Sequence, residues 1–222
     1  ISDIHISIFK EPDRITQFKE FCDLTVSAFK PPVVIASGDL TDAKARDAMG
    51  SGQHLDEWKH YKRVLDESRV LEKTTWLDVR GNHDNFNILN IDAPDNYFLN
   101  YSAQGKHHSR SYLHQITVNS RKYSFIAVDA CLQPGPKRPF NFVGFLDAKE
   151  METIKELAEE SKRLGSESII CFVHYPTSSI LYGGDESLRD VMAKNKDGLA
   201  YLCGHYHTLA GIAPEMYTLQ RG

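Results

Sequence analysis

Cysteine is scarce in this sequence, and no cysteine pair has the spacing of a zinc site. There are four cysteines among 222 residues, and none of them forms a C-x-x-C pair. Cys131, Cys171 and Cys203 stand inside apolar runs, where cysteine usually behaves as a small buried hydrophobe. A disulfide-dense scaffold and a cysteine-type zinc site are therefore excluded.

The chain also lacks an excess of positive charge and any long apolar run. It carries 26 Lys and Arg against 30 Asp and Glu, for a net charge of −4. A field that attracts nucleic acid is absent, so we expect no nucleic-acid partner. No run approaches the ~20 apolar residues of a membrane-spanning helix, so we expect a membrane contact only through parts of the protein outside these residues.

What the sequence does contain is an alternation of helical and strand-like segments. Residues 13–29, 54–71 and 148–163 carry apolar side chains at helical spacing. Short apolar runs such as "PPVVIASGD" and "SIICFVHYP" separate them, and two runs within residues 111–130 are typical of an antiparallel hairpin. This order predicts an α/β fold with a mixed sheet, in a single domain over residues 1–222. Because "ISDIH" opens within a strand-like run, we expect a fragment of a longer chain.

Side chains that can bind metals collect where five strand-like runs end. Each of them alone has an ordinary explanation as an Asx turn, a helix cap or a buried histidine. In open α/β sheets, however, ligands bind at the carboxyl ends of the strands. Five coincident clusters therefore favour a metal site. The side chains are Asp3, His5, Asp39, Asn82, His83, His174, His205 and His207.

In order, the motifs D-x-H, G-D, G-N-H-D, H and G-H-x-H resemble those of the calcineurin-like metallophosphoesterase superfamily from end to end of the chain. The resemblance implies a four-layer α/β sandwich of two mixed β-sheets flanked by helices, and a dinuclear metal centre. It assigns one metal to Asp3, His5, Asp39 and His207. It assigns the second metal to Asp39, Asn82, His174 and His205.

The same resemblance implies a mechanism of phosphoester hydrolysis. Nitrogen and oxygen ligands without thiolate fit two ions of Mn, Fe or Zn, with Asp39 as the bridge. A hydroxide between the metals attacks phosphorus, His83 protonates the departing oxygen, and Asp42 orients His83. The G-H-x-H ending indicates phosphodiesterases and small-molecule phosphatases. We therefore expect a small phosphodiester or phosphomonoester, such as a nucleotide.

Substrate recognition is expected from Asn82, His83 and Arg138. Arg138 lies in "PGPKRPF", which an ordinary solvated turn explains equally well. The loops 85–110 and 132–145 carry no motif that identifies a substrate. Two other functions stay open. A catalytically silent binding module would usually have lost ligands that are all present here, and a nuclease is disfavoured by the acidic balance.

Overall fold

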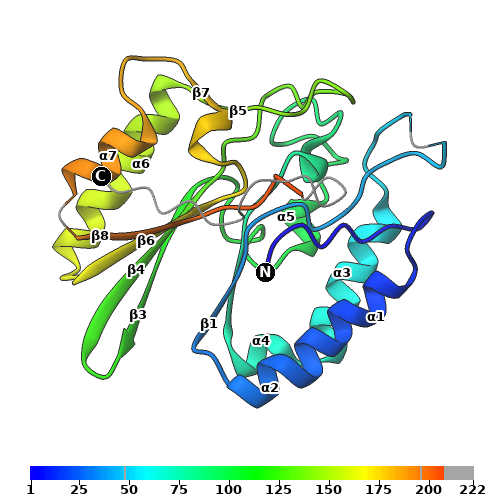
Figure 1. Cartoon of the computed structure of the whole chain (residues 1–222), viewed down its shortest axis with the longest axis horizontal. Coiled ribbons are helices and arrows are strands. Elements are labelled where there is room, and N and C mark those ends of the chain that lie inside the picture. Colours follow the sequence, from blue (N-terminus) through cyan, green and yellow to red (C-terminus); the bar gives the residue numbers. More distant parts are fainter. Residues whose placement is uncertain (48, 196, 208–222) are drawn as a thin grey trace.

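Four layers build the molecule, with two sheets at the centre and helices on both outer faces (Figure 1). The computed structural model describes residues 1–47, 49–195 and 197–207. Residues 48, 196 and 208–222 of the predicted domain lie outside the described residues. The α/β sandwich predicted from the motifs is thereby confirmed.

The first outer layer is made by the N-terminal helices. α1 (Asp13–Glu20) continues through a π-helical turn (Phe21–Thr25) into α2 (Val26–Phe29), as the spacing over 13–29 predicts. α3 (Leu55–Glu67) and α4 (Val70–Lys73) fill the predicted segment 54–71. Together they bury a core that includes Phe18, Trp58 and Trp76. This layer covers the small parallel sheet of β1 (Val33–Ala36) and β2 (Thr75–Asp78).

The second sheet has four strands in the order β3-β4-β6-β8, and it is mixed as predicted. β3 (Tyr112–Val118) and β4 (Arg121–Val128) form the antiparallel hairpin, turning through Asn119 and Ser120 at φ of 49° and 66°. β6 (Ser168–Val173) and β8 (Gly198–Leu202) then add in parallel. These parallel strands end at the same edge of the sheet.

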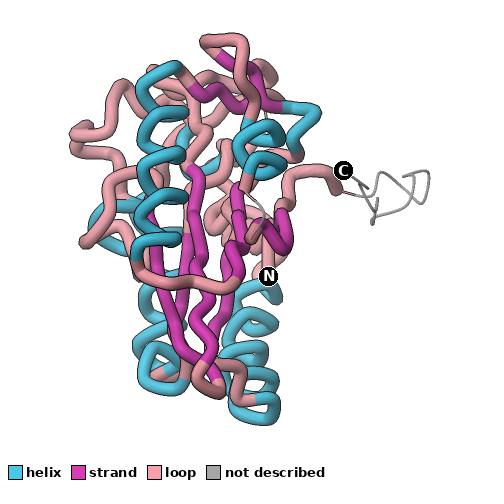
Figure 2. The backbone as a smooth tube through the Cα atoms, turned by 90° about the vertical axis from the view of Figure 1, so that its left-hand side faces the viewer, coloured by secondary structure: helices cyan, strands magenta, loops and turns pink. Residues whose placement is uncertain are grey.

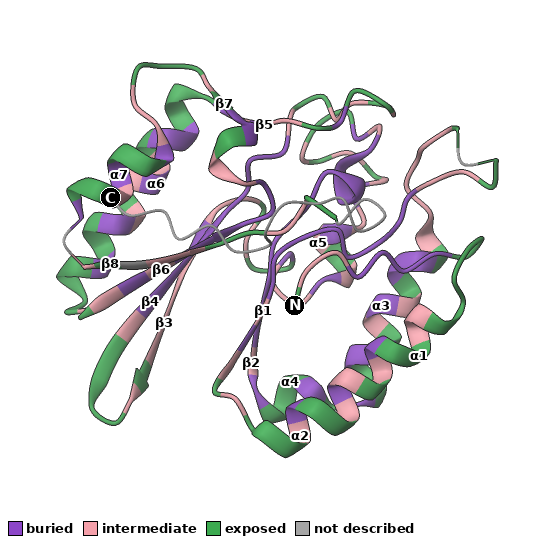
Figure 3. Cartoon of the chain, viewed as in Figure 1, coloured by how far each residue is buried: buried purple, intermediate pink, exposed green. Residues whose placement is uncertain are grey.

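The helices α6 (Ala148–Arg163) and α7 (Leu188–Lys194) form the other outer layer. Figure 2 shows the strands running side by side between the two sets of helices. A cluster that includes Leu77, Tyr112 and Phe172 fills the space between the sheets. Burial is concentrated on the inward faces and in the central loops (Figure 3). The remaining short elements are α5 (Phe98–Tyr101) and the parallel pair β5 (Gly144–Leu146) and β7 (Ile180–Tyr182).

The first residues depart from the strand that "ISDIHIS" predicts. They run beside the end of β1, where Asp3 N donates to Gly38 O (3.0 Å) and His5 N donates to Asp39 O (2.9 Å). Asp3 and His5 have φ of 54° and 48°, a left-handed conformation that interrupts a regular strand. The segment is therefore an extended edge with a single bridge, Ile6 to Thr41.

Across the part of the chain that the structure describes, none of the helices combines the length and the apolar character needed to cross a membrane.

Candidate metal centre

Five of the seven predicted ligands meet at one edge of the sandwich because they follow the ends of strands. Asp39 comes three residues after β1, Asn82 four residues after β2, and His174 directly after β6. His205 and His207 follow β8, and the N-terminal segment lies against the loop that carries Asp39. All seven residues assigned to metals by the motifs therefore lie in one cluster.

The first group of donors comprises Asp3, His5, Asp39 and His207, whose ligand atoms all lie within 4.8 Å of one another. His207 Nε2 is 2.9 Å from Asp3 Oδ1 and 3.0 Å from His5 Nε2. His5 Nε2 is 3.6 Å from Asp39 Oδ2. The structure thus brings together the complete set predicted for one metal.

The second group contains Asp39, His174 and His205, again within 4.8 Å. Asn82 joins it, since its Oδ1 lies 2.9 Å from both His174 Nε2 and His205 Nδ1. His174 Nε2 is 3.2 Å from Asp39 Oδ2. Asp39 is the residue common to both groups, which is the placement that a bridging carboxylate requires.

The donor chemistry fits a pair of transition-metal cations. Two pairs of imidazole nitrogens face each other, His5 with His207 at 3.0 Å and His174 with His205 at 3.2 Å. In each donor group, the two imidazole nitrogens and the neighbouring carboxylate or amide oxygens are close enough to bind one cation together. Imidazole and carboxylate donors suit Mn, Fe and Zn.

Glycines leave the space that these donors occupy. A Cβ at Gly81 would lie 2.9 Å from Asp39 Cγ and closer still to Asp39 Oδ1 and N. A Cβ at Gly204 would also lie within 3.0 Å of Asp3 Oδ2. A Cβ at Gly38 would lie 2.8 Å from His174 Cβ. Contacts below 3.0 Å are not tolerated by packed carbon atoms. The glycines of three motifs are therefore needed for the close approach of ligands.

The backbone is strained at four ligand positions. Asp3, His5, Asp39 and His205 have φ of 54°, 48°, 51° and 78°. This left-handed region is uncommon for residues other than glycine, and it persists only where surrounding contacts enforce it. Its concentration at the centre is typical of a functional site.

Asp84 makes some of the contacts that hold the backbone of these ligand loops in place. Its buried carboxylate accepts hydrogen bonds from Gly81 N (2.9 Å), Thr41 N (3.0 Å) and Leu40 N (3.1 Å). It thereby ties the turn that carries Asn82 to the loop that carries Asp39. Burial, with the nearby charge of Asp39, raises the pKa of Asp84 to about 7.

Electrostatics couple Asp39 to the histidines around it. Burial alone would raise the pKa of Asp39, but the charges of His174 and His83 hold it well below the ordinary value. Burial likewise opposes protonation of His174, yet Asp39 raises the pKa of His174 to about 9. The buried carboxylate is thus kept ionised, the form that binds cations.

His83 is held by the backbone of Asp42. His83 Nδ1 donates to the backbone carbonyl of Asp42 (2.5 Å), whereas the Asp42 carboxylate is 3.7 Å away. That carboxylate is paired with Lys44 Nζ at 2.7 Å. Since Nδ1 is a donor, Nε2 is the ring nitrogen that faces the centre, 3.9 Å from Asp39 Oδ2.

The loop 132–145 reaches the centre through its backbone. His205 Nε2 donates to the Phe142 carbonyl (3.0 Å), which leaves His205 Nδ1 facing Asn82 and His174. Arg138 is held by its backbone N–H, which donates to Ser51 Oγ (3.2 Å). Its contact with substrate stays a prediction. The carbonyl of Phe142 and the side chain of Lys44 are parts of the site that the motifs do not indicate.

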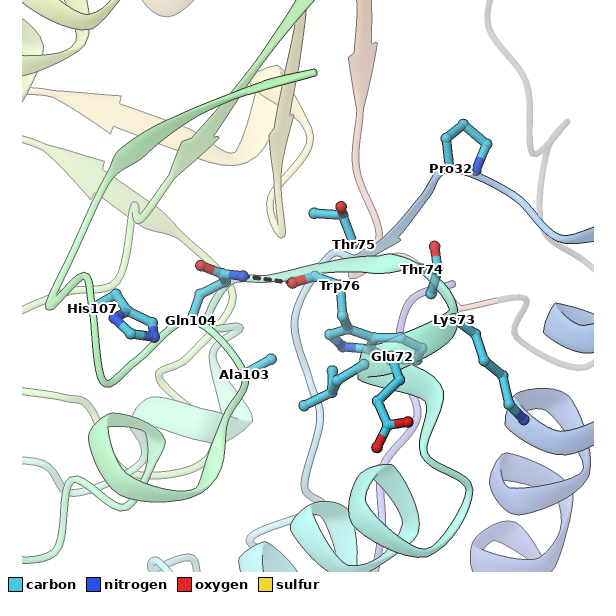
Figure 4. A pocket seen from close by; sticks show the side chains of 10 residues that line it. Pro32, Glu72, Lys73, Thr74, Thr75, Trp76, Ala103, Gln104 and His107 are labelled. Atoms are coloured by element: carbon cyan, nitrogen blue, oxygen red, sulfur yellow. Dashed lines mark hydrogen bonds between the residues drawn. The ribbon is translucent and has the colours of Figure 1, made fainter. Parts of the chain in front are cut away.

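A separate pocket of about 540 Å³ lies near the start of β2 and the turn after α5 (Figure 4). Gln104 crosses it and donates to Trp76 O (2.7 Å). The seven predicted ligands are not among its lining residues. The candidate centre is therefore defined by its converging donors and lies apart from this pocket.

Comparison with known proteins agrees with the geometry. The family model described as calcineurin-like phosphoesterase matches residues 1–209. Transmembrane protein 62 of Mus musculus is 44% identical over 218 residues, which is 98% of this chain and 33% of that protein. The similarity of "RVLEKTTWLDVRGNHDNFN" and "AYLCGHYHTLAG" to that protein is thereby confirmed.

Two further relatives extend the comparison. A candidate metallophosphoesterase from Arabidopsis thaliana is 30% identical over 219 residues, or 95% of this chain and 29% of that protein. The chain thus spans about a third of the length of these curated relatives. A dimetal phosphatase from Danio rerio superimposes with a TM-score of 0.64 at 14% identity, covering 92% of this chain and 79% of that one. That likeness shows the fold.

Proposed function

This chain belongs to the calcineurin-like phosphoesterase family, and on that premise we propose that it hydrolyses small phosphoric esters at a dinuclear metal centre. The observation that carries the proposal is the position of Asp39 in both donor groups. One metal is assigned to Asp3, His5, Asp39 and His207, and the other to Asp39, Asn82, His174 and His205. The substrate in this proposal is a phosphodiester or phosphomonoester such as a nucleotide.

Bound cations of this type neutralise phosphoryl oxygens and supply a hydroxide nucleophile at neutral pH. The protein's own residues hold and orient the reacting groups. Asp84 fixes the turn that carries Asn82 and His83, and Asp39 Oδ1 accepts from His83 N (2.9 Å). Asn82 and His83 are thus placed side by side, where we assign them contacts with the phosphoryl group. Arg138 is included in the substrate contacts as the sequence suggests.

His83 is assigned the role of proton donor to the departing oxygen. The Asp42 carbonyl accepts from Nδ1, so the proton for the leaving group is carried on Nε2. Burial and the nearby charge of Lys44 lower the pKa of His83, and the charges of Asp39 and Asp42 oppose this shift only in part. A positioned general acid contributes about 10²–10⁴ in rate.

The proposal also includes a location: this domain is part of a longer protein that is attached to a membrane. Transmembrane protein 62 is named as a membrane protein, and this chain covers a third of it. We extend that location to the whole protein as part of the proposal, with the membrane contact made outside the described residues.

The test of the activity combines metal analysis with hydrolysis. Protein purified without chelator should carry close to two transition metals per chain and should cleave p-nitrophenyl phosphate or bis-p-nitrophenyl phosphate. A chelator should abolish cleavage, and Mn, Fe or Zn should restore it. Folded, metal-loaded protein that cleaves no ester would instead favour the silent binding module.

The test of His83 uses the leaving group. His83→Asn should keep its metals and lose about 10²–10⁴ in rate on an alkyl phosphate ester, whose oxygen needs a proton. A nitrophenyl ester, whose leaving group needs little protonation, should lose much less. Equal losses on both esters would assign His83 to phosphate binding, and loss of metal would make it a ligand.

A further inference from the structure

Glu57 is a buried carboxylate that the proposed mechanism does not use. It lies in the first turn of α3 and is fully buried. Its Oε1 accepts from Ile8 N (3.2 Å), and its Oε2 accepts from Ala43 N (2.9 Å). Both oxygens of this helix side chain therefore hold the backbone, one on each of two separate segments.

Each of those two segments carries ligands of the first metal. Ile8 follows His5 by three residues, and Ala43 follows Asp39 by four. Backbone hydrogen bonds join the segments side by side up to this point: Asp3 N to Gly38 O, His5 N to Asp39 O, Ile6 N to Leu40 O and Asp42 N to Ile6 O. The Glu57 carboxylate continues this ladder at the next positions, where it links Ile8 and Ala43 through one side chain.

The helix gives this link a firm support. Trp58 and Tyr61 of the same helix are buried in the core of the first outer layer. Ala43 has a φ of 49°, a left-handed conformation that persists only where surrounding contacts enforce it. The hydrogen bond from Ala43 N to Glu57 is one of those contacts.

We propose that Glu57 is a positioning residue for the first metal, because it holds the N-terminal ligand segment against the loop that carries Asp39. The inference rests on the proposed dinuclear centre and deepens it. The second metal depends less on this contact, since its other ligands follow β2, β6 and β8 and lie outside both segments. Residues that orient metal ligands in this way typically contribute about 10–100-fold in metal affinity.

The test measures metal binding by equilibrium dialysis of folded protein against Zn or Mn at about pH 8. Burial raises the pKa of Glu57 to about 7, so its carboxylate is ionised there. Glu57→Gln turns one of the two acceptors into an amide N–H that faces a backbone N–H. The first site should bind about 10–100-fold more weakly, while the second should change by less than about threefold.

Two variant backgrounds identify the weakened site. In Asp3→Asn, where the first site is already impaired, Glu57→Gln should add little further loss of metal. In Asn82→Ala, where the second site is impaired, Glu57→Gln should remove most of the metal that remains. The reverse pattern would overturn the inference.

Glu150→Gln is the matched control. Glu150 is likewise a buried glutamate in the first turn of a helix, α6, where it accepts from Ser111 Oγ and lies 3.4 Å from Arg110 Nε. This variant should keep both metal affinities, whatever stability it loses. Glu57→Asp keeps the charge on a shorter side chain and should show the same selective loss to a smaller degree. It replaces Glu57→Gln if that variant does not fold.

Denaturation with and without chelator gives a second readout. Metal stabilises the folded state according to its binding, so it should raise the unfolding free energy of Glu57→Gln less than that of the wild type. A loss of stability that is equal in both conditions, with both affinities unchanged, would mean that Glu57 only supports the fold, and the inference would be wrong. Wild-type protein that takes up no metal would overturn the proposed function itself.

Discussion

Replacing Gly81 by alanine adds one methyl group at the point where two ligand loops touch. The new Cβ would lie 2.9 Å from Asp39 Cγ and closer still to Asp39 Oδ1 and N. Carbon atoms pack at about 3.5–4.0 Å, so Asp39 or the Gly81 turn must retreat by roughly 1 Å. The strain cannot be relieved by a flexible side-chain end, because one of the crowded atoms belongs to the backbone.

The magnitudes follow from that displacement. Overpacking of this kind costs about 1–3 kcal/mol of unfolding free energy. For a domain of about 150–250 residues, each kcal/mol lowers Tm by about 2–4 °C, which gives a drop of about 2–12 °C. A shift of about 1 Å at a reacting centre costs about 10²-fold in rate. Because Asp39 serves both donor groups, the content of both metals should fall as well.

The assay joins thermal denaturation, metal analysis and ester hydrolysis on one preparation. Gly184→Ala is the control, since a Cβ there meets no atom within 4 Å. The control should stay within about 0.5 kcal/mol of the wild type and keep its metals. If Gly81→Ala keeps two metals and wild-type turnover, the close approach of Gly81 to Asp39 is not what the centre requires.

Two further predictions concern the bridging ligand and a buried ion pair. Asp39→Asn should weaken both metal sites, whereas Asp3→Asn should chiefly weaken one; equal metal loss measured by elemental analysis would contradict the bridge. Arg80→Met removes the buried partner of Asp129, whose Oδ2 lies 3.0 Å from Arg80 Nε, and should lower the unfolding free energy by about 3–5 kcal/mol. Arg63→Met, which breaks an exposed pair with Glu67 at 4.0 Å, should change it little in the same denaturation experiment.

The sequence alone predicts the placement of the ligands because strand ends are local features. Asp39 and His174 directly or closely follow apolar runs, and parallel strands bring their ends to one edge. The helices over 13–29 and 148–163 are recognisable for the same reason, since their apolar spacing is continuous. The periodic spacing of apolar residues therefore predicts most of the helices and strands of the fold.

Contacts made by the backbone leave no such pattern. The Asp42 and Phe142 carbonyls orient His83 and His205, and any residue type offers a carbonyl. The left-handed turns at Asp3 and His5 likewise replace the strand that their neighbours predict. Lys44 did leave a signal, two residues after Asp42, but an isolated lysine is more often a solvated surface residue.

The turn that carries Asn82 and His83 is held from both sheets at once. From one side, Asp84 binds the loop after β1 through Leu40 N and Thr41 N. From the other, Cys131 Sγ donates to Gly81 O (3.3 Å), and Asp129, just after β4, accepts from the buried Arg80. A change in the turn itself therefore disturbs the ligands directly, while a change in Arg80 first loosens the attachment to one sheet. Gly81→Ala should accordingly cost more metal for each kcal/mol of stability lost than Arg80→Met does.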